Sequence, residues 1–477
     1  MISNNGNTPA PSFRDPGGRV FFVQNEVFRA VTGEASADFK CAIASPAVRE
    51  FVSRGSMVRT SLVDPGSTGF TVSPPEMEKE AAVIARHERV PFASYPYEWS
   101  PEMLYAAAVL TLDLQESLVR EGLGLKDASP YNILFNGPDP VFVDWLSVER
   151  RDEHDPVWLA QAQFTRTFLL PLLVNRHFGV SLSQIFLSER DGLEPEAVAR
   201  LCGGPMKWRQ PFRSLVTLPA LLGKRGANGS IYQQKRLSDP EKARFILDHQ
   251  ISSLRRQLRR VAPDPARTSG WAEYVGPNQH FTDHYLQSKQ DFITRTFEHK
   301  APAKVLDIGC NTGFFSRLAA KFGASVVGID LDPTAAGRVW QMSKAEQLSV
   351  LPLVVDISRP TPATGWINSE NLSFLDRASG AEFDTVIMLA VIHHMLVTER
   401  IPLTEILKLA AELTRDRLII EFVPPNDPMF RTLCRGRDEL YRHLTREHFE
   451  DRIGEYFSVE KKEKLPDSDR WLYQLKK

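Results

Sequence analysis

The chain has 477 residues, enough for two or three domains, and 42% hydrophobic with 25% charged residues is ordinary globular composition. Its 58 Lys and Arg against 59 Asp and Glu leave a net charge of −1, which argues against a protein built mainly to hold nucleic acid. The four cysteines, Cys41, Cys202, Cys310 and Cys434, lie far apart and form neither a CxxC zinc pattern nor a disulfide framework. We therefore expect a cytoplasmic protein. No membrane span is expected either, because no apolar stretch of the sequence approaches the length of about 20 residues that a span needs.

Composition shifts divide the chain into four segments. Residues 1–18 have neither a basic nor an apolar region of a signal peptide and are expected to form a flexible tail. An α+β module is expected over 19–202, with a helix that starts at Ser100-Pro101, and a basic helical connector over 203–262. The Pro263-Asp-Pro265 sequence then marks the start of an α/β domain over 263–477.

The connector holds thirteen Lys and Arg against three Asp and Glu. Leu247, Ile251, Leu254 and Leu258 follow helical spacing, with arginines on the other faces. This pattern favours an amphipathic helix that packs one face and exposes the other. A basic patch that steers an anionic substrate remains the alternative.

In the last segment β-type and helical runs alternate. The expected strands are Lys304–Ile308, Ser325–Ile329, Val350–Val355, Phe383–Leu389 and Arg417–Val423; the helices between them are Gly313–Phe322, Thr334–Glu346 and Leu403–Leu413; Tyr456–Lys461 and Arg470–Leu475 form a terminal hairpin. Such alternation predicts a doubly wound, mostly parallel, Rossmann-like sheet that ends in an antiparallel hairpin.

The first of these strands leads into the loop Asp307-Ile-Gly309-Cys-Asn311-Thr-Gly313. Open α/β sheets bind ligands outside the carboxyl ends of their strands, so this loop is a candidate binding site. A dinucleotide fingerprint would need glycine where Asn311 and Phe314 stand, so a nicotinamide cofactor is not expected. Asp307 would repel a pyrophosphate and suits a ligand with an ammonium group. Asn311 tolerates a positive φ and is compatible with the tight turn.

The next two strands also end in acids. Asp330 follows the second strand and can accept both hydroxyls of a ribose, and Asp356 follows the third, where it can meet an adenine amino group. Acids that merely cap helices in an unrelated α/β domain are the alternative. Three acids at successive strand ends, together with the small-residue turn, favour a nucleoside-bearing ligand.

These residues resemble the class I S-adenosylmethionine-dependent methyltransferases over about 271–477. The resemblance implies S-adenosyl-L-methionine as cofactor, with Asp307, Gly309, Asn311 and Gly313 around its methionine part. It also implies that Asp330 holds the ribose, Asp356 the adenine, and Leu389 a further side of the cofactor. The stretches Tyr285-x-x-x-Lys289, Ile392-His-His394 and Ile420-Glu-Phe-Val-Pro-Pro425 are similar to a bacterial subgroup that includes nodulation-type host-specificity proteins.

His393 and His394 follow the fourth strand, whose end faces the transferring methyl group in this architecture. Histidine can take a proton from a hydroxyl or amine acceptor near pH 7, so both are candidate catalytic residues. Alternatively, one packs and the other pairs with Glu399 or a backbone carbonyl. No glutamate lies within helical reach before the pair, so a metal site is not expected. Glu421, at the end of the fifth strand, is a further candidate for the acceptor side.

The first module carries Asp127 and Asn132 at a separation of five positions, followed by Asp144. This spacing resembles the catalytic loop of protein kinases and aminoglycoside phosphotransferases, which implies Asp127 as base and the other two as magnesium ligands. No phosphate loop or V-A-I-K-type lysine is found between Arg19 and Glu80. A kinase-like fold without phosphotransfer, an active transferase and a chance resemblance all remain open.

Together the motifs predict a methyltransferase with an accessory module for substrate or partner binding. The methyl acceptor is not identified by the sequence, although a small molecule or glycan is favoured, and neither is the oligomeric state. Two other functions stay open. One is an ATP-dependent phosphotransferase or bifunctional enzyme that uses Asp127, Asn132 and Asp144. The other is a non-catalytic adaptor that binds S-adenosylmethionine.

Overall fold

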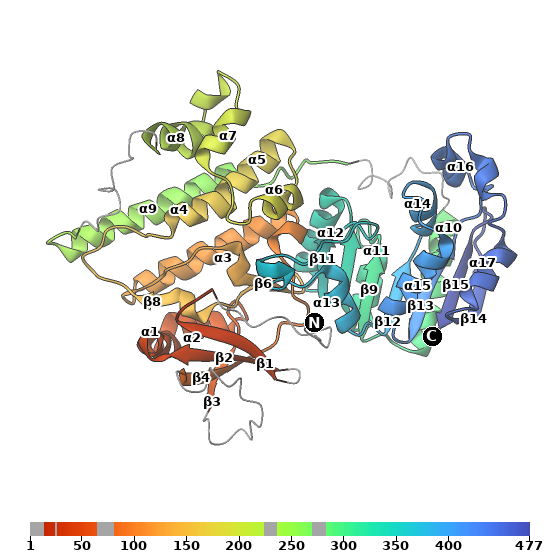
Figure 1. Ribbon diagram of the computed structural model, residues 1–477, viewed down its shortest axis with the longest axis horizontal. Coiled ribbons are helices and arrows are strands. Elements are labelled where there is room, and N and C mark those ends of the chain that lie inside the picture. The colour runs from red at the N-terminus through yellow and green to blue at the C-terminus, as the bar shows by residue number, and fades with distance from the viewer. Residues whose placement is uncertain (1–13, 24–25, 64–80, 224–235, 270–282) are drawn as a thin grey trace. The chain divides into compact units, whose positions relative to one another are not determined.

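The computed structural model describes residues 14–23, 26–63, 81–223, 236–269 and 283–477 (Figure 1). The chain forms two compact units that divide between Pro265 and Ala266, next to the Pro-rich boundary expected from the sequence. No described helix is both long enough and apolar enough to cross a membrane.

The first unit begins with a four-stranded antiparallel sheet in the order β1-β2-β4-β3. Its strands are β1 (Gly18–Val23), β2 (Glu26–Thr32), β3 (Thr60–Val63) and β4 (Ala81–His87), with α1 (Gly33–Ala44) and α2 (Pro46–Ser53) after β2. Two short antiparallel pairs follow the long helix α3 (Pro101–Val119): β5 (Leu123–Leu125) with β8 (Val148–Arg150), and β6 (Ile133–Asn136) with β7 (Asp139–Phe142). The remaining helices are α4 (Gln161–Phe164), α5 (Leu170–Phe178), α6 (Leu182–Ser188), α7 (Pro195–Leu201), α8 (Leu218–Gly223) and α9 (Pro240–Arg260).

The helix α9 lies in the segment expected to be a basic connector, and it packs against α3. Its leucine and isoleucine stripe, Leu247, Ile251, Leu254 and Leu258, is fully buried, which confirms the predicted amphipathic helix. Arg255, beside this stripe, places Nη2 2.7 Å from an oxygen of Asp113 and 2.7 Å from an oxygen of Glu116, both on α3. The connector segment is therefore joined to the first unit by apolar and ionic contacts.

The second unit is built on a seven-stranded sheet in the order β11-β10-β9-β12-β13-β15-β14. The parallel strands are β9 (Lys304–Ile308), β10 (Ser325–Asp330), β11 (Val350–Val354), β12 (Thr385–Met388) and β13 (Arg417–Phe422); β14 (Ser458–Lys464) and β15 (Trp471–Lys476) form the antiparallel hairpin. This confirms the predicted doubly wound sheet with its terminal hairpin. The fourth strand ends at Met388, one residue earlier than predicted, and Ala390 follows with a φ of 50°.

Helices cover this sheet as the alternating sequence requires (Figure 1). They are α10 (Asp283–His299), α11 (Phe314–Lys321), α12 (Pro333–Glu346), α13 (Phe374–Gly380), α14 (Ile392–Val397), α15 (Leu403–Leu413), α16 (Pro428–Cys434) and α17 (Arg446–Ile453). Helices α11 and α12 pack on β9, β10 and β11, whereas α15 contacts α13, α14 and α17. The carboxyl ends of β9 to β13 meet at one edge, and this edge positions the candidate site.

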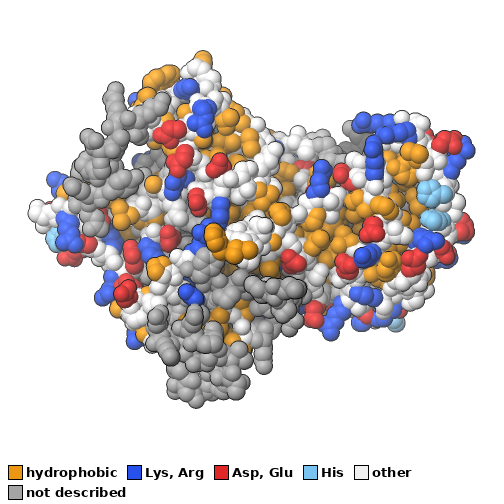
Figure 2. Space-filling view, viewed as in Figure 1, with side chains coloured by type: hydrophobic (Ala, Val, Ile, Leu, Met, Phe, Trp, Pro, Cys, Tyr) orange, Lys and Arg blue, Asp and Glu red, His pale blue; other side chains and the backbone are white. Residues whose placement is uncertain are grey.

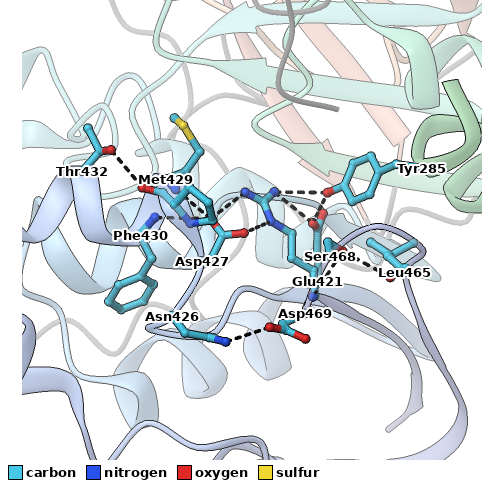
Figure 3. A network of polar contacts seen from close by, with 12 residues as sticks. Tyr285, Glu421, Asn426, Asp427, Met429, Phe430, Thr432, Leu465, Ser468 and Asp469 are labelled. Atoms are coloured by element: carbon cyan, nitrogen blue, oxygen red, sulfur yellow. Dashed lines mark hydrogen bonds and ion pairs between the residues drawn. The ribbon is translucent and has the colours of Figure 1, made fainter. Parts of the chain in front are cut away.

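A buried ionic network lies at the same edge (Figure 3). The side chain of Glu421, at the end of β13, has no exposed surface, and its Oε2 lies 2.6 Å from Nζ of Lys289 on α10. Its Oε1 accepts a hydrogen bond of 2.7 Å from the hydroxyl of Tyr285, one turn earlier on α10. Burial alone would raise the pKa of Glu421, but Lys289 and Arg470 outweigh it and hold this pKa below its usual value.

Arg470, just before β15, completes the network. Its Nη1 lies 3.3 Å from Oε1 of Glu421, while Nε and Nη2 donate to the two carboxylate oxygens of Asp427 at 2.7 and 3.0 Å. Such a two-point contact fixes the guanidinium plane as well as its position. Two cations and two carboxylates thus balance inside the protein and join α10, β13, β15 and the loop before α16.

Glu421→Gln should lower the free energy of unfolding by about 3–5 kcal/mol, because it leaves two buried cations with one carboxylate between them. The midpoint of urea unfolding, followed by circular dichroism, measures this change. Glu463→Gln is the matched control: Glu463 pairs with Arg295 at 2.7 Å but is 40% exposed, so its loss should cost below about 1 kcal/mol. Equal shifts in the two variants would contradict the role assigned to the network.

Candidate active site

A cavity of about 760 Å³ opens at the carboxyl edge of the sheet, between the ends of β9 to β12 and the helices α14 and α16. Cavities of this size are typical of small-molecule and cofactor sites. The sequence-predicted residues among those that line it are Gly309, Asn311, Asp330, Asp356, Leu389 and His394. Asp307, Gly313 and His393 do not line it. The structure therefore brings six of the nine candidate residues to one cavity.

The loop after β9 has the tight turn expected from its small residues. Gly309 has a φ of 73°, and a Cβ there would lie 2.5 Å from Cγ2 of Val391, so a side chain would collide with the opposite cavity wall. Asn311 has a φ of 48°, which confirms that asparagine takes the left-handed conformation at this position. Because Gly309 has no side chain, the backbone of this loop lines the cavity close to Val391.

Asp330, the last residue of β10, holds this loop in place. Its Oδ2 accepts a hydrogen bond of 2.8 Å from the backbone N–H of Asn311, and Oδ1 accepts one of 2.9 Å from Asp332. Burial raises the pKa of this carboxyl group above its ordinary value. Because a carboxylate oxygen can accept more than one hydrogen bond, Asp330 keeps acceptor capacity on the cavity side.

Asp307 has a different environment. It is 3% exposed, its Oδ2 accepts a 2.6 Å hydrogen bond from the hydroxyl of Ser316 on α11, and burial raises its pKa to about 7. Gly313 has a φ of 82° and lies against Val339, where an added Cβ would come within 2.9 Å. Asp307 and Gly313 therefore shape the turn but are not among the residues that line the cavity.

Asp356 lies at the other end of the cavity, after β11. Its Oδ1 accepts a 2.9 Å hydrogen bond from the backbone N–H of Ser358, and its Oδ2 lies 3.2 Å from Nη2 of Arg359. Arg359 also reaches Glu399 at 3.5 Å. The cavity is thus lined by the glycine turn at Gly309 and by two acids, Asp330 and Asp356. This set of groups fits an adenosine that carries an amino-acid chain.

The two histidines of α14 have unequal positions. Their ring centroids are 4.2 Å apart, but His394 lines the cavity whereas His393 is 1% exposed. Within the described residues, neither ring nitrogen of His393 has a hydrogen-bond partner. Burial and the charge of Arg470 lower the pKa of His394 to about 4, and burial, followed by His394, Arg470 and Lys289, holds the pKa of His393 well below its usual value. Both imidazoles are therefore neutral near pH 7.

The sequence missed several cavity residues. Arg400, Arg435 and Arg437 come from the loops after α14 and α16, where no strand or spacing marks a site. The sequence signal that could have drawn attention to Arg435 and Arg437 is the cluster of basic residues around α16. Glu421, a candidate for the acceptor side, is instead enclosed by the ionic network behind the histidines.

In the first unit, Asn132 and Asp144 lie close together and are linked through Ser147. Asn132 donates to the hydroxyl of Ser147 at 3.0 Å, and that hydroxyl donates to Oδ2 of Asp144 at 2.7 Å. The other oxygen, Oδ1, lies 3.0 Å from Nη1 of Arg29 on β2, a residue that the sequence did not single out. Burial and then the charge of Asp144 raise the pKa of Asp127, so the three residues share one polar cluster.

Comparisons with known proteins agree with the second unit. Residues 279–464 match a methyltransferase-domain family. Over 472 residues the chain is 29% identical to the nodulation protein NoeA of Rhizobium meliloti (strain 1021), which covers 98% of this chain and 96% of that protein. A segment of 58 residues is 43% identical to the chloroplastic tocopherol O-methyltransferase of Arabidopsis thaliana, covering 12% of this chain and 17% of that enzyme. These matches confirm both predicted resemblances of this unit.

Solved structures similar to the chain have low overall scores. The magnesium protoporphyrin IX methyltransferase of Synechocystis PCC 6803 is 19% identical with a TM-score of 0.32, covering 43% of this chain and 92% of that one. The N-methyltransferase NodS of Bradyrhizobium japonicum WM9 is 15% identical with a TM-score of 0.30, covering 41% and 97%. The bifunctional kinase-methyltransferase WbdD is 19% identical with a TM-score of 0.29, covering 40% and 38%.

Proposed function

Since this chain is an S-adenosylmethionine-dependent methyltransferase, with its methyltransferase domain over residues 279–464, we propose that it methylates a small molecule or glycan held beside His394. The observation that carries the proposal is the single cavity shared by the three-part cofactor cradle and one histidine. The cradle consists of the Gly309 turn, Asp330 and Asp356. Leu389 and His394 both line this cavity. Leu389 directly follows β12, and His394 lies on α14, the next helix.

The cofactor supplies an electrophilic methyl group on a sulfonium. In the proposed arrangement Asp330 accepts hydrogen bonds from the ribose hydroxyls, and Asp356 lies where it meets the adenine. The backbone of the Gly309–Gly313 turn lies against the methionine part. Methyl transfer is an in-line displacement, so holding acceptor and methyl group in line supplies most of the rate.

His394 is proposed to orient the acceptor and take its proton. Because its pKa is lowered to about 4, the imidazole is neutral and its unprotonated nitrogen has the lone pair of a hydrogen-bond acceptor throughout the neutral range. The same low pKa makes it a weak base, so its larger contribution is orientation. His393, fully buried behind it, supports the position of the neighbouring ring.

Asp330→Ala should weaken binding of S-adenosylhomocysteine by about 1–3 kcal/mol, because it removes hydrogen bonds between a charged group and the ribose. Titration calorimetry on the full chain measures the affinity. Asp416→Ala is the control, because Asp416 pairs with Lys300 at 2.8 Å just before β13, at the opposite edge of the sheet. Unchanged affinity in Asp330→Ala would contradict the ribose assignment.

His394→Asn should reduce turnover by about 10²-fold or more and leave S-adenosylhomocysteine affinity intact, because the shorter amide misplaces the acceptor and cannot take its proton. His393→Asn should mainly lower the melting temperature. Transfer of labelled methyl from the cofactor into a cell extract measures turnover.

The pH dependence gives a second readout. A folded pKa below the unfolded one keeps His394 neutral until the pH falls to about 4, so its protonation should cause no loss of turnover between pH 7 and 5. A histidine-dependent loss centred near pH 6.5, or equal turnover in both variants, would contradict this role.

For the first unit we propose a kinase-like module that binds substrate or a partner without phosphoryl transfer. Arg29 and Ser147 engage both oxygens of Asp144, the residue that would hold magnesium in a kinase. Arg29 is 8% exposed and also approaches Nε2 of His87 at 3.4 Å, so this cation is part of the fold. An active phosphotransferase would need Asp144 released from Arg29, and a non-catalytic adaptor would lack turnover altogether.

Asp127→Asn should leave methyl transfer within about twofold and should not lower the melting temperature. The pKa of Asp127 is raised on folding, so its charged form costs stability at neutral pH and the amide removes that cost. Thermal unfolding and labelled-methyl transfer check both points, with Mg-ATP added in parallel. ATP hydrolysis that disappears in Asp127→Asn would overturn the assignment and favour a phosphotransferase.

A further inference from the structure

A second cavity, of about 610 Å³, adjoins the cofactor cavity. It is enclosed by α14, the start of α15, α16, the segment after α16 and α17. Val397, Arg400 and Arg437 line both cavities, so the two spaces share a wall. Figure 2 shows basic, acidic, histidine and hydrophobic side chains at this end of the second unit.

The two cavities differ in their acidic residues. The cofactor cavity combines the carboxylates of Asp330, Asp356 and Glu399 with four arginines, Arg359, Arg400, Arg435 and Arg437. The second cavity is lined by three arginines and two histidines and by no aspartate or glutamate; these are Arg400, Arg437, Arg452, His443 and His448. Its remaining surface is mostly apolar, with Leu396, Leu403, Leu440 and Leu444 among its members. A space with this lining favours a ligand that is partly apolar and negatively charged.

Arg400 and Arg437 are the cations best placed for such a ligand. Among the described residues neither side chain forms an ion pair, whereas eight other arginines of this unit do. Arg452, deeper in α17, is already paired with Glu455 and Asp451. The histidines add hydrogen-bonding edges, and their rings contact each other at 5.5 Å between centroids. The two unpaired arginines stand where the cavities meet.

We propose that the second cavity is an acceptor subsite for an anionic group, a phosphate, sulfate or carboxylate carried on an apolar body. The inference rests on the proposed function, because it assigns the acceptor's reacting atom to the cofactor cavity near His394. Arg400 and Arg437 bind the anion as charged hydrogen-bond donors, which suit planar or tetrahedral oxyanions. The leucine-lined base binds the apolar part. The acceptor therefore spans both cavities, and the arginines set its direction.

The test uses the full chain saturated with S-adenosylhomocysteine and titrated with phenyl phosphate, phenyl sulfate or benzoate, with benzyl alcohol as the neutral probe. At least one anionic probe should bind more tightly than benzyl alcohol, with an affinity that falls as salt is added. The double variant Arg400→Met/Arg437→Met should lose about tenfold or more of that affinity. Which probe binds best identifies the anion. Arg431→Met is the matched control, since Arg431 lies on α16 but lines neither cavity.

Four results would overturn the inference. If S-adenosylhomocysteine binds but no anionic probe does, the subsite fails and the proposed function stands. If the double variant loses S-adenosylhomocysteine affinity as well, the arginines belong to the cofactor's own carboxylate. If Arg431→Met loses as much probe affinity as the double variant, the probe responds to the overall positive charge of this region and not to Arg400 and Arg437. If S-adenosylhomocysteine itself does not bind, the proposed function fails too.

Discussion

The buried carboxylate of Glu421 is the constraint on which the second unit depends. A charge without exposed surface is tolerated only with balanced partners, and here Lys289 and Arg470 come from the two ends of the domain sequence. The pairs require α10 and the terminal hairpin to close on β13. Burial and then the positive charge of Arg470 lower the pKa of His394 to about 4, which keeps this residue neutral at the cavity wall. One ionic network therefore links the closure of the fold to the chemistry of the site.

Much of this unit was accessible from sequence because its signals are local. Alternating strands and helices determine the sheet, and Asp330 and Asp356 stand at strand ends, where any parallel sheet collects them. Asn311 likewise follows from its own backbone preference. The partners of Glu421 were not accessible in full: Tyr285 and Lys289 share a helix face by their spacing, but Arg470 meets them only through the hairpin register.

The first unit shows the same division between local and distant information. Asn132 lies near Asp144 because the two residues flank one short hairpin, formed by β6 and β7. Arg29, more than a hundred positions earlier, comes from a sheet whose placement no local pattern determines. The sequence between Arg19 and Glu80 offers no V-A-I-K-type lysine, and the cation that lies beside Asp144 is Arg29. In both units, therefore, the charged partner that no local pattern could predict comes from a distant part of the sequence.

The outer strand β14 has a consequence for how copies of this chain meet one another. Its sequence, Ser-Val-Glu-Lys-Lys-Glu-Lys, is mostly exposed, and five of its seven side chains are charged. An edge strand offers unpaired backbone groups to any passing strand, and a charged, bulged edge discourages such pairing. The register shift between Val459 and Lys461 adds the bulge. The hairpin that seals Arg470 inside the domain therefore also protects the open side of its sheet from aggregation.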